Sequence, residues 1–254
     1  MQIQNEYVLK LIEKGERIDG RKLDEFRPIQ IEKGIIENAE GSARVKIGST
    51  EVLAGVKLAV DKPFPDKPDE GLLIVNAEFS PIASPQFESG PPKEEAIELA
   101  RVVDRGIRES KAIDMQKLCI VPGEQAWAVF IDIHTINHAG NLMDAAVLAA
   151  VAALSDAKIP AWDGKKIDYT IKKDKLPLRF KPVAISFTKI ENIFILDPLL
   201  DEESVAQGKL IITTKDDGNV CAIQKTGPMF LKISEIEDML NKVGMYAERL
   251  RRLI

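Results

Sequence analysis

The stretch NHAGNLMDAAVLAA, residues 137–150, contains a polar segment, a glycine and then the start of an apolar helix. A glycine at such a turn exposes backbone N–H groups at the N-terminus of the helix, where proteins commonly bind phosphate. Asn141 and Leu142 follow Gly140 directly, and the stretch contains no arginine or lysine. It therefore predicts a phosphate-binding turn that lacks a cation. Because glycines also open many helices for steric reasons alone, the turn by itself does not establish a site.

The composition is that of an ordinary globular protein. The chain has 254 residues, 45% of them hydrophobic and 30% charged, which is enough for one large domain or two packed domains. Its longest apolar run, residues 145–154, is roughly half the length of a membrane span, and residues 1–25 contain no apolar segment of a secretory signal. Cys119 and Cys221 lack metal-binding spacing and are predicted to be buried free thiols. We expect a cytoplasmic protein with no membrane segment and no metal site.

The charge balance limits how the chain can bind nucleic acid. Its net charge is −5 at pH 7. A protein that binds RNA by itself usually carries an excess of basic residues, because neutralising phosphates supplies most of the affinity. If RNA is a ligand, a local basic patch or a partner must supply the positive charge.

The spacing of apolar residues predicts an α+β chain. Strands precede a helix in each half without strict βαβα alternation, which indicates two layers of similar size. Residues 161–182 are polar, rich in lysine and closed by prolines, so they are predicted to connect a first domain, residues 1–160, to a second domain, residues 183–254. The individual predictions are a helix at 3–14, strands from 29 to 79 with a proline-rich excursion at 61–71, a helix after Pro91 and Pro92, strands around 117–136, a helix at 140–157, a strand at 183–189, a hairpin turning at Asp217–Gly218 and a C-terminal helix from Ser234.

The helix after Pro92 carries Arg101, Arg105 and Arg108 within an arc of about 60°. Their spacing along the axis suits successive phosphates of a single RNA strand. The alternative is a solvated face of ion pairs, since three acidic residues lie three or four positions from the arginines. These acidic residues are Glu98, Asp104 and Glu109.

Acidic residues also cluster in the second half. Asp197 precedes the run Asp-Glu-Glu at 201–203. Such a cluster suits a metal ion or acid–base chemistry. It equally suits the first turn of a helix, where carboxylates interact favourably with the helix dipole. Both interpretations stay open on the residues alone.

Taken in order, several stretches resemble the RNase PH family of phosphorolytic exoribonucleases over nearly the whole chain. The runs GPPKEEAIELARVVDRGIRES (90–110) and NHAGNLMDAA (137–146) are similar to the non-catalytic RNase PH-like ring subunit of the archaeal RNA exosome. The other stretches are RIDGRKLDEFRPI (17–29), GSARVKIGSTEVLAGV (41–56), ELARVVDRGIR (98–108), ILDPLLDEESVAQGKLIIT (195–213) and AIQKTG (222–227).

The resemblance implies a two-domain RNase PH-like fold built from βαβ units of the ribosomal-protein type. It implies that six such chains close into a ring, in which three copies of this subunit alternate with three copies of a catalytic sister. It further implies single-stranded RNA and RNA-binding cap subunits as partners. Inorganic phosphate and Mg²⁺ would be used at the partner's active site, and this chain would need no cofactor of its own.

The resemblance also makes the missing cation informative. Active family members read A-D-G-G-T-R or A-D-A-G-S-R where this chain reads NHAGNL. Asn141 therefore replaces a hydroxyl donor, and Leu142 replaces the arginine that would clamp the attacking phosphate. A leucine side chain offers neither charge nor hydrogen-bond donors.

A second departure is independent of the first. Active members continue D-L-x-Y-x-E-D-S-x-A-x-x-D, and the last aspartate is the acid–metal residue. If Asp197 corresponds to the first aspartate, Lys209 falls on the last. A carboxyl group with a pKa of about 3.9 is thus replaced by an ammonium group with a pKa of about 10.4. The exchange inverts the charge and removes a ligand for a hard metal ion. We therefore expect no catalytic residue and no activity in this chain alone.

The preferred hypothesis is a non-catalytic exosome subunit that shapes its partner's active site and contacts RNA during 3′-to-5′ phosphorolytic degradation and processing. The family places arginines equivalent to Arg101 and Arg105 on the RNA backbone near the subunit interface. Arg108 belongs to the same candidate RNA-binding set, although Asp104 is well placed to pair with it.

Two alternatives stay open on the sequence. The chain is a self-sufficient phosphorolytic exoribonuclease if Lys209 or Asp201 acts in an unfamiliar way and a distant basic side chain replaces Leu142. It is an RNA-binding module outside any nuclease complex if it stays monomeric, which light scattering would detect.

Overall fold

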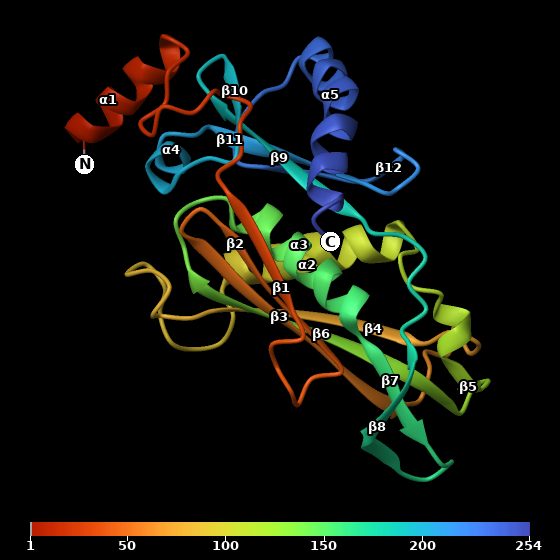
Figure 1. Ribbon diagram of the computed structural model, residues 1–254. Helices are drawn as coiled ribbons and strands as arrows, with labels where there is room; N and C mark the ends of the chain where they lie inside the picture. The colour runs from red at the N-terminus through yellow and green to blue at the C-terminus, as the bar shows by residue number, and fades with distance from the viewer. Residues whose placement is uncertain (1) are drawn as a thin grey trace.

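The computed structural model describes residues 2–254 and consists of stacked layers of sheet and helix (Figure 1). The first half forms a six-stranded sheet with the order β1-β2-β3-β6-β4, and β5 pairs with β6. β4 runs parallel to β6, whereas β1, β2 and β3 pair antiparallel. The strands are β1 (Ile29–Lys33), β2 (Gly41–Ile47), β3 (Thr50–Asp61), β4 (Leu72–Phe79), β5 (Cys119–Val121), which follows the short 3₁₀ helix η1 (Met115–Leu118), and β6 (Gln125–Asn137).

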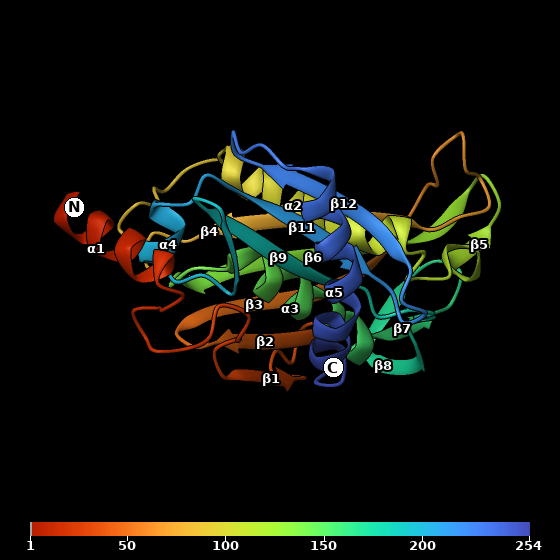
Figure 2. The same ribbon diagram turned by 90° about the horizontal axis from the view of Figure 1, so that it is seen from above.

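The second half forms an antiparallel sheet of four strands with the order β10-β9-β11-β12. The predicted turn at Asp217–Gly218 joins β11 to β12. Helix α5 (Ile233–Arg251) packs on β9 and β11, on the side of this sheet that faces away from the first half (Figure 2). The remaining elements are β9 (Val183–Ile190), β10 (Ile193–Leu196), α4 (Leu200–Ser204), β11 (Gly208–Thr214) and β12 (Val220–Thr226).

Helix α3 (Leu142–Asp156) lies between the two sheets and contacts β2 and β3 on one side and β9 on the other. A helix that is apolar all round is expected to be buried, and α3 is buried along most of its length. Its many alanines allow close approach of the sheets. A Cβ atom at Gly41 of β2 would lie only 2.4 Å from the carbonyl oxygen of Ala153. The backbone of β2 therefore packs directly on this helix.

Helix α2 (Glu94–Glu109) has two different faces. It begins shortly after Pro91 and Pro92, with Glu94 and Glu95 in its first turn, as predicted. Leu99, Val103 and Ile107 are buried against the shared core. The opposite face carries the charged residues.

The α+β class is confirmed, but the prediction of two layers of similar size is wrong. The sheets have six and four strands, and helices lie between them. The physical reason is that an α3 without a polar face must be covered on both sides. The largest cluster of buried apolar side chains runs through both halves, so the domain boundaries at residues 160 and 183 stay a prediction.

Two elements lie outside this arrangement. Helix α1 (Gln2–Glu13) contacts α4, and its Val8 and Ile12 pack with Ile190 and Ile195 of the second half. Strands β7 (Lys158–Trp162) and β8 (Ile167–Lys175) form a hairpin in the segment predicted to connect the domains. That segment is therefore partly regular structure.

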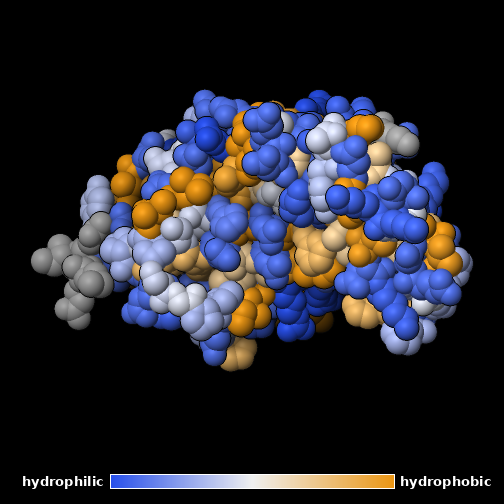
Figure 3. Space-filling view, turned by 90° about the horizontal axis from the view of Figure 1, so that it is seen from below, coloured by the Kyte–Doolittle hydropathy of each residue, from blue (hydrophilic) through white to orange (hydrophobic). Residues whose placement is uncertain are grey.

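Seen from below, hydrophilic residues on the outer face of the six-stranded sheet are interrupted by several hydrophobic patches (Figure 3). Cys119 and Cys221 are free but only partly buried, which corrects the prediction of buried thiols. Both lie on short or edge strands, β5 and β12, where one side of the strand is open.

Across residues 2–254, no helix has the length and apolar character needed to cross a membrane.

Candidate functional site

The turn from β6 into α3 lies where the two halves meet. Gly140 has φ of +93°, and a Cβ atom there would lie 2.2 Å from the carbonyl oxygen of Pro198. Asn141 precedes the first residue of α3 with φ of 56°, in the left-handed region that asparagine tolerates better than most residues. The predicted glycine turn at a helix N-terminus is thus present, and the second half holds it closely.

The side chain of Asn141 joins two buried carboxyl groups. Its Nδ2 donates to Asp144 Oδ2 at 3.1 Å and to Asp197 Oδ1 at 3.0 Å. Ser186 Oγ donates to Asp144 Oδ1 at 2.7 Å. Burial raises the pKa of Asp144 to about 6, although the hydrogen bonds from Ser186 and Asn141 oppose that change. Asn141 therefore ties α3 to the second half.

Two arginines contact the same junction, Arg27, which is buried, and Arg21, which is partly buried. Arg27 Nη2 lies 2.6 Å from Asp197 Oδ1, and Arg21 Nη1 lies 3.0 Å from Asp197 Oδ2. Burial alone would raise the pKa of Asp197, but the hydrogen bonds and charge of Arg27 outweigh it, so this pKa lies below its ordinary value. Arg27 also donates to the carbonyl oxygens of Ala139 at 2.8 Å and Gly140 at 3.1 Å. This guanidinium group supports the backbone of the turn.

A second buried pair fixes α4. Arg17 Nη2 lies 2.5 Å from Glu202 Oε2, and both side chains are fully buried. Glu202 also accepts a hydrogen bond from the backbone N–H of Leu199 at 2.7 Å. Asp201, Glu202 and Glu203 lie in the first turn of α4, which confirms the helix interpretation of the acidic cluster. In the sequence, Arg17, Arg21 and Arg27 are recognisable only as parts of a signature, because Glu202 and Asp197 lie more than 100 positions away from them.

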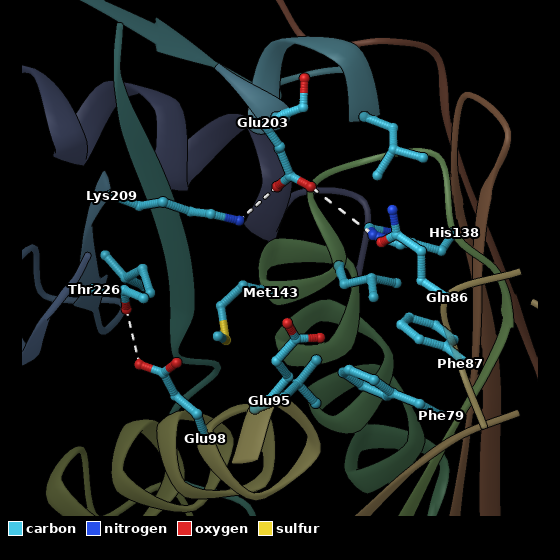
Figure 4. Close-up of a pocket in the computed structure, with 15 residues that line it drawn as sticks. Phe79, Gln86, Phe87, Glu95, Glu98, His138, Met143, Glu203, Lys209 and Thr226 are labelled. Atoms are coloured by element: carbon cyan, nitrogen blue, oxygen red, sulfur yellow. Dashed lines mark hydrogen bonds and ion pairs between the residues drawn. The ribbon is translucent and has the colours of Figure 1, made fainter. Parts of the chain in front are cut away.

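A pocket of about 370 Å³ opens in front of the turn, with walls from α2, α3, α4 and β11 (Figure 4). Leu142, which is 7% exposed, contributes an apolar side chain to it. Asn141 does not appear among the lining residues because its side chain is turned toward Asp144 and Asp197. The lining consists of Phe79, Gln86, Phe87, Glu95, Glu98, Leu99, His138, Leu142, Met143, Leu200, Glu203, Ser204, Lys209, Ile211 and Thr226.

Glu203 is the centre of the polar contacts in this pocket. Its Oε1 accepts from the backbone N–H of Asn141 at 3.1 Å and from Lys209 Nζ at 2.5 Å. Its Oε2 lies 4.0 Å from His138 Nε2. Lys209 and His138 lie on either side of the carboxylate (Figure 4). The N–H group at the start of α3 therefore already has an anionic acceptor.

The other walls add negative charge and aromatic surface. Glu95 and Glu98 reach in from α2, and Thr226 Oγ1 donates to Glu98 Oε1 at 2.8 Å. The His138 ring stacks on Phe87 with centroids 5.5 Å apart. Burial lowers the pKa of His138, so the ring is mostly neutral at pH 7. Three carboxylates thus face one lysine.

The candidate RNA-binding arginines lie on another part of α2. Arg108 pairs with Asp104 at 2.6 Å and donates to the carbonyl oxygen of Leu73 at 3.1 Å. Arg101 is exposed in a hollow beside β4, and Arg105 is half-buried. Among the side chains that the structure describes, neither Arg101 nor Arg105 forms an ion pair or a side-chain hydrogen bond. The predicted pairing with Glu98 is wrong, since Glu98 faces Gln224 and Thr226 across the pocket.

Sequence comparison matches residues 25–160 to domain 1 and residues 182–242 to domain 2 of the 3′ exoribonuclease family. The chain belongs to this family. The resemblance to RNase PH-type exoribonucleases is therefore confirmed.

Its relatives include proteins named exosome complex component Rrp42. The protein from Methanocella arvoryzae is 50% identical over 251 residues, which cover 98% of this chain and 95% of that protein. The protein from Pyrococcus abyssi is 46% identical over 256 residues, which cover 99% of this chain and 93% of that protein.

Comparison with solved structures gives matches to exosome chains as well. A chain from the Archaeoglobus fulgidus exosome with RNA bound to the active site matches with a TM-score of 0.93 and 47% identity, covering 99% of this chain and 97% of that one. A chain from an archaeal exosome core matches with a TM-score of 0.88 and 44% identity, covering 98% of this chain and 95% of that one. Rice Rrp46, at 18% identity and a TM-score of 0.70, shares the fold.

The pocket does not fit the phosphate and metal ion of active family members. The N–H of Asn141 is bonded to Glu203, and Leu142 offers no cation. Lys209 places an ammonium group where the family's acid–metal residue is expected, next to Glu203. In the part of the chain that the structure describes, no group of three or more His, Cys, Asp or Glu side chains is arranged to hold a metal ion.

Proposed function

We propose that this chain is a non-catalytic subunit of an archaeal exosome ring that degrades RNA from its 3′ end with inorganic phosphate. It pairs with a catalytic RNase PH-like sister, three copies of each, and shapes the sister's active site. The observation that carries the proposal is the Glu203–Lys209 ion pair beside Leu142 in the pocket of the family's active site. In-line phosphoryl transfer depends almost wholly on positioning and on stabilising negative charge, and this pocket offers a carboxylate instead.

The α2 arginines supply the contact with RNA in this proposal. Arg101 and Arg105 have no hydrogen-bond or ion-pair partner among the described side chains, so their guanidinium groups are available to phosphates. Arg108 contributes less because Asp104 holds it. With a net charge of −5, the chain relies on its sister and on RNA-binding cap subunits for the rest of the positive field. Inorganic phosphate and Mg²⁺ act at the sister's active site.

The self-sufficient enzyme needs a basic side chain that replaces Leu142. Of the described residues that line the pocket, Lys209 is the one lysine or arginine, and its ammonium group is bound by Glu203. Arg27 contacts the turn, but Asp197 and two backbone carbonyls use its donors. Neither residue supplies the missing clamp.

The decisive experiment compares the purified chain with the chain co-expressed with its catalytic sister. We expect the isolated chain to release no nucleoside diphosphates from polyadenylate in the presence of inorganic phosphate. The co-expressed complex should have the mass of a ring with three copies of each subunit and should degrade the RNA in a phosphate-dependent manner.

Two outcomes contradict the proposal. Phosphate-dependent turnover by the isolated chain would establish a self-sufficient nuclease. A monomer in light scattering that does not associate with the sister would establish an RNA-binding module outside a nuclease complex.

A further inference from the structure

We infer that Glu203 is a built-in anion that occupies this pocket's phosphate position and keeps inorganic phosphate out. The inference deepens the proposed function and rests on it, but it goes further. The pocket lacks a cation at Leu142, and it also holds an internal competitor: active members read aspartate where this chain has Glu203, and the longer glutamate side chain accepts a hydrogen bond from the turn N–H of Asn141. The carboxylate group accounts for this exclusion by charge and by position.

Glu203 occupies the two hydrogen-bond donors that a phosphate would need in this pocket. Two donors converge on the same atom, Oε1: the backbone N–H of Asn141 at 3.1 Å and the ammonium group of Lys209 at 2.5 Å. An N–H group at a helix N-terminus and a nearby cation are the donors that proteins use for phosphate. Here both donors are bonded to an oxygen of the protein itself. An incoming phosphate oxygen would have to displace that carboxylate.

The surroundings keep the carboxylate in place. The Glu203 side chain is 13% exposed, that of Lys209 is 27% exposed and that of His138 is 11% exposed. The backbone at this point is fixed as well, because Gly140 packs on Pro198 and α4 is held by the buried Arg17–Glu202 pair. Screening by solvent is weaker at such a site than at the surface, so the ion pair resists exchange with a dissolved anion.

The net charge of the pocket also disfavours an incoming phosphate. Glu95 and Glu98 face the same space, and His138 is mostly neutral at pH 7 because burial lowers its pKa. A phosphate dianion would therefore meet three carboxylates and one ammonium group that is already bonded. Phosphate and the 3′ end of RNA are thus excluded from this pocket and remain available to the sister's site.

The test is phosphate binding by the isolated chain, measured by calorimetric titration with inorganic phosphate. The wild-type chain should show no saturable binding. Glu203→Ala frees two convergent donors and should show saturable phosphate binding that is tighter, by about tenfold or more, than the detection limit of the wild-type titration. Adding Lys209→Ala to that variant should abolish the gain. Glu95→Ala is the matched control, because it removes a carboxylate from the same pocket without freeing these donors, and it should gain much less phosphate binding than Glu203→Ala.

A second measurement does not depend on any variant folding. The amide proton signal of Asn141 in the wild-type chain should not move when phosphate is added, since its hydrogen bond is already made. The inference is overturned if that signal shifts saturably in the wild type, if folded Glu203→Ala gains no binding, or if Glu95→Ala gains as much. These readouts measure binding. Turnover by the isolated chain would instead contradict the proposed function, so the two failures are distinguishable.

Discussion

Asp144 is a fully buried carboxyl group that titrates within an accessible pH range. Its pKa is about 6 in the folded protein and near the ordinary 3.8 in the unfolded chain, so the folded state binds this proton more tightly. The stability it contributes is complete below about pH 4 and is lost as the pH rises to about 6. Since one pKa unit corresponds to about 1.4 kcal/mol, the loss is about 3 kcal/mol. Relative to the Asp144→Asn variant, the free energy of unfolding of the wild type should fall by about 3 kcal/mol between pH 4 and pH 7.

Urea denaturation of both proteins at several pH values measures this difference. The comparison is needed because Asp197, with a lowered pKa, changes the stability in the opposite direction as the pH falls. Asp238→Asn is the control, since Asp238 lies in an exposed pair with Lys242 on α5. A pH-independent difference between wild type and Asp144→Asn would show that Asp144 does not titrate in this range.

Single residues differed greatly in how well they could be predicted. The identities of Leu142 and Lys209 predicted the missing clamp and the inverted charge, because the family resemblance assigns each of these residues to a position with a known role in active members. The role of Glu203 was not predictable, since its partner Asn141 lies 62 positions away and pairs with it only after both halves have folded. The buried roles of Arg17 and Arg27 were hidden for the same reason.

Helix α2 presents its arginines away from the core, and this leads to a graded prediction for RNA binding by the assembled ring. Arg105→Ala and Arg101→Ala should each weaken binding and lower the slope of log K against log salt by about 0.7, the value for one phosphate contact on a single strand. Arg108→Ala should have a smaller effect, because Asp104 and the carbonyl oxygen of Leu73 already hold its guanidinium group.

Filter binding of labelled polyadenylate at several salt concentrations tests this order. Lys242→Ala, on the far helix α5, serves as a control for the loss of one positive charge. An unchanged slope for both Arg101→Ala and Arg105→Ala would mean that α2 does not contact the RNA backbone.

At the scale of elements, local sequence was a good guide where one face of an element is apolar. The helices α2 and α5 begin close to the predicted residues, and the β11–β12 hairpin turns at the predicted Asp217–Gly218. The β7–β8 hairpin was not predicted, although Ile167, Tyr169 and Ile171 alternate with polar residues as strands do. Its lysines and flanking prolines resemble those of a linker, and its exposure leaves only a weak pattern.

The whole molecule should unfold as one unit, because a single apolar core runs through both halves. Trp127 and Trp162 are the two tryptophans of the chain. Trp127 lies on β6 of the first half, and Trp162 on β7 packs edge-on against it with ring centroids 6.5 Å apart. Asp197 belongs to the second half but holds Arg27 of the first. Asp197→Ala leaves that guanidinium group buried without its partner, which should cost about 3–5 kcal/mol. The unfolding midpoint reported by tryptophan fluorescence should fall accordingly.

Circular dichroism of the same variant should give the same midpoint as the fluorescence if the unfolding is cooperative. Asp238→Ala, which removes an exposed carboxylate from the second half, should change the midpoint little. A tryptophan transition that does not respond to Asp197→Ala would mean that the halves unfold separately.

The burial of α3 on every side has a consequence for the turn that precedes it. A helix covered by sheets on both sides cannot slide or rotate without opening the core, so side chains around its first turn can be exchanged while the backbone of the turn stays in place. The departures from the active members' motifs at Leu142 and Lys209 are then exchanges of side chains on a fixed main chain. Building an anion site at this turn would require changes of those side chains, with the main chain already in place.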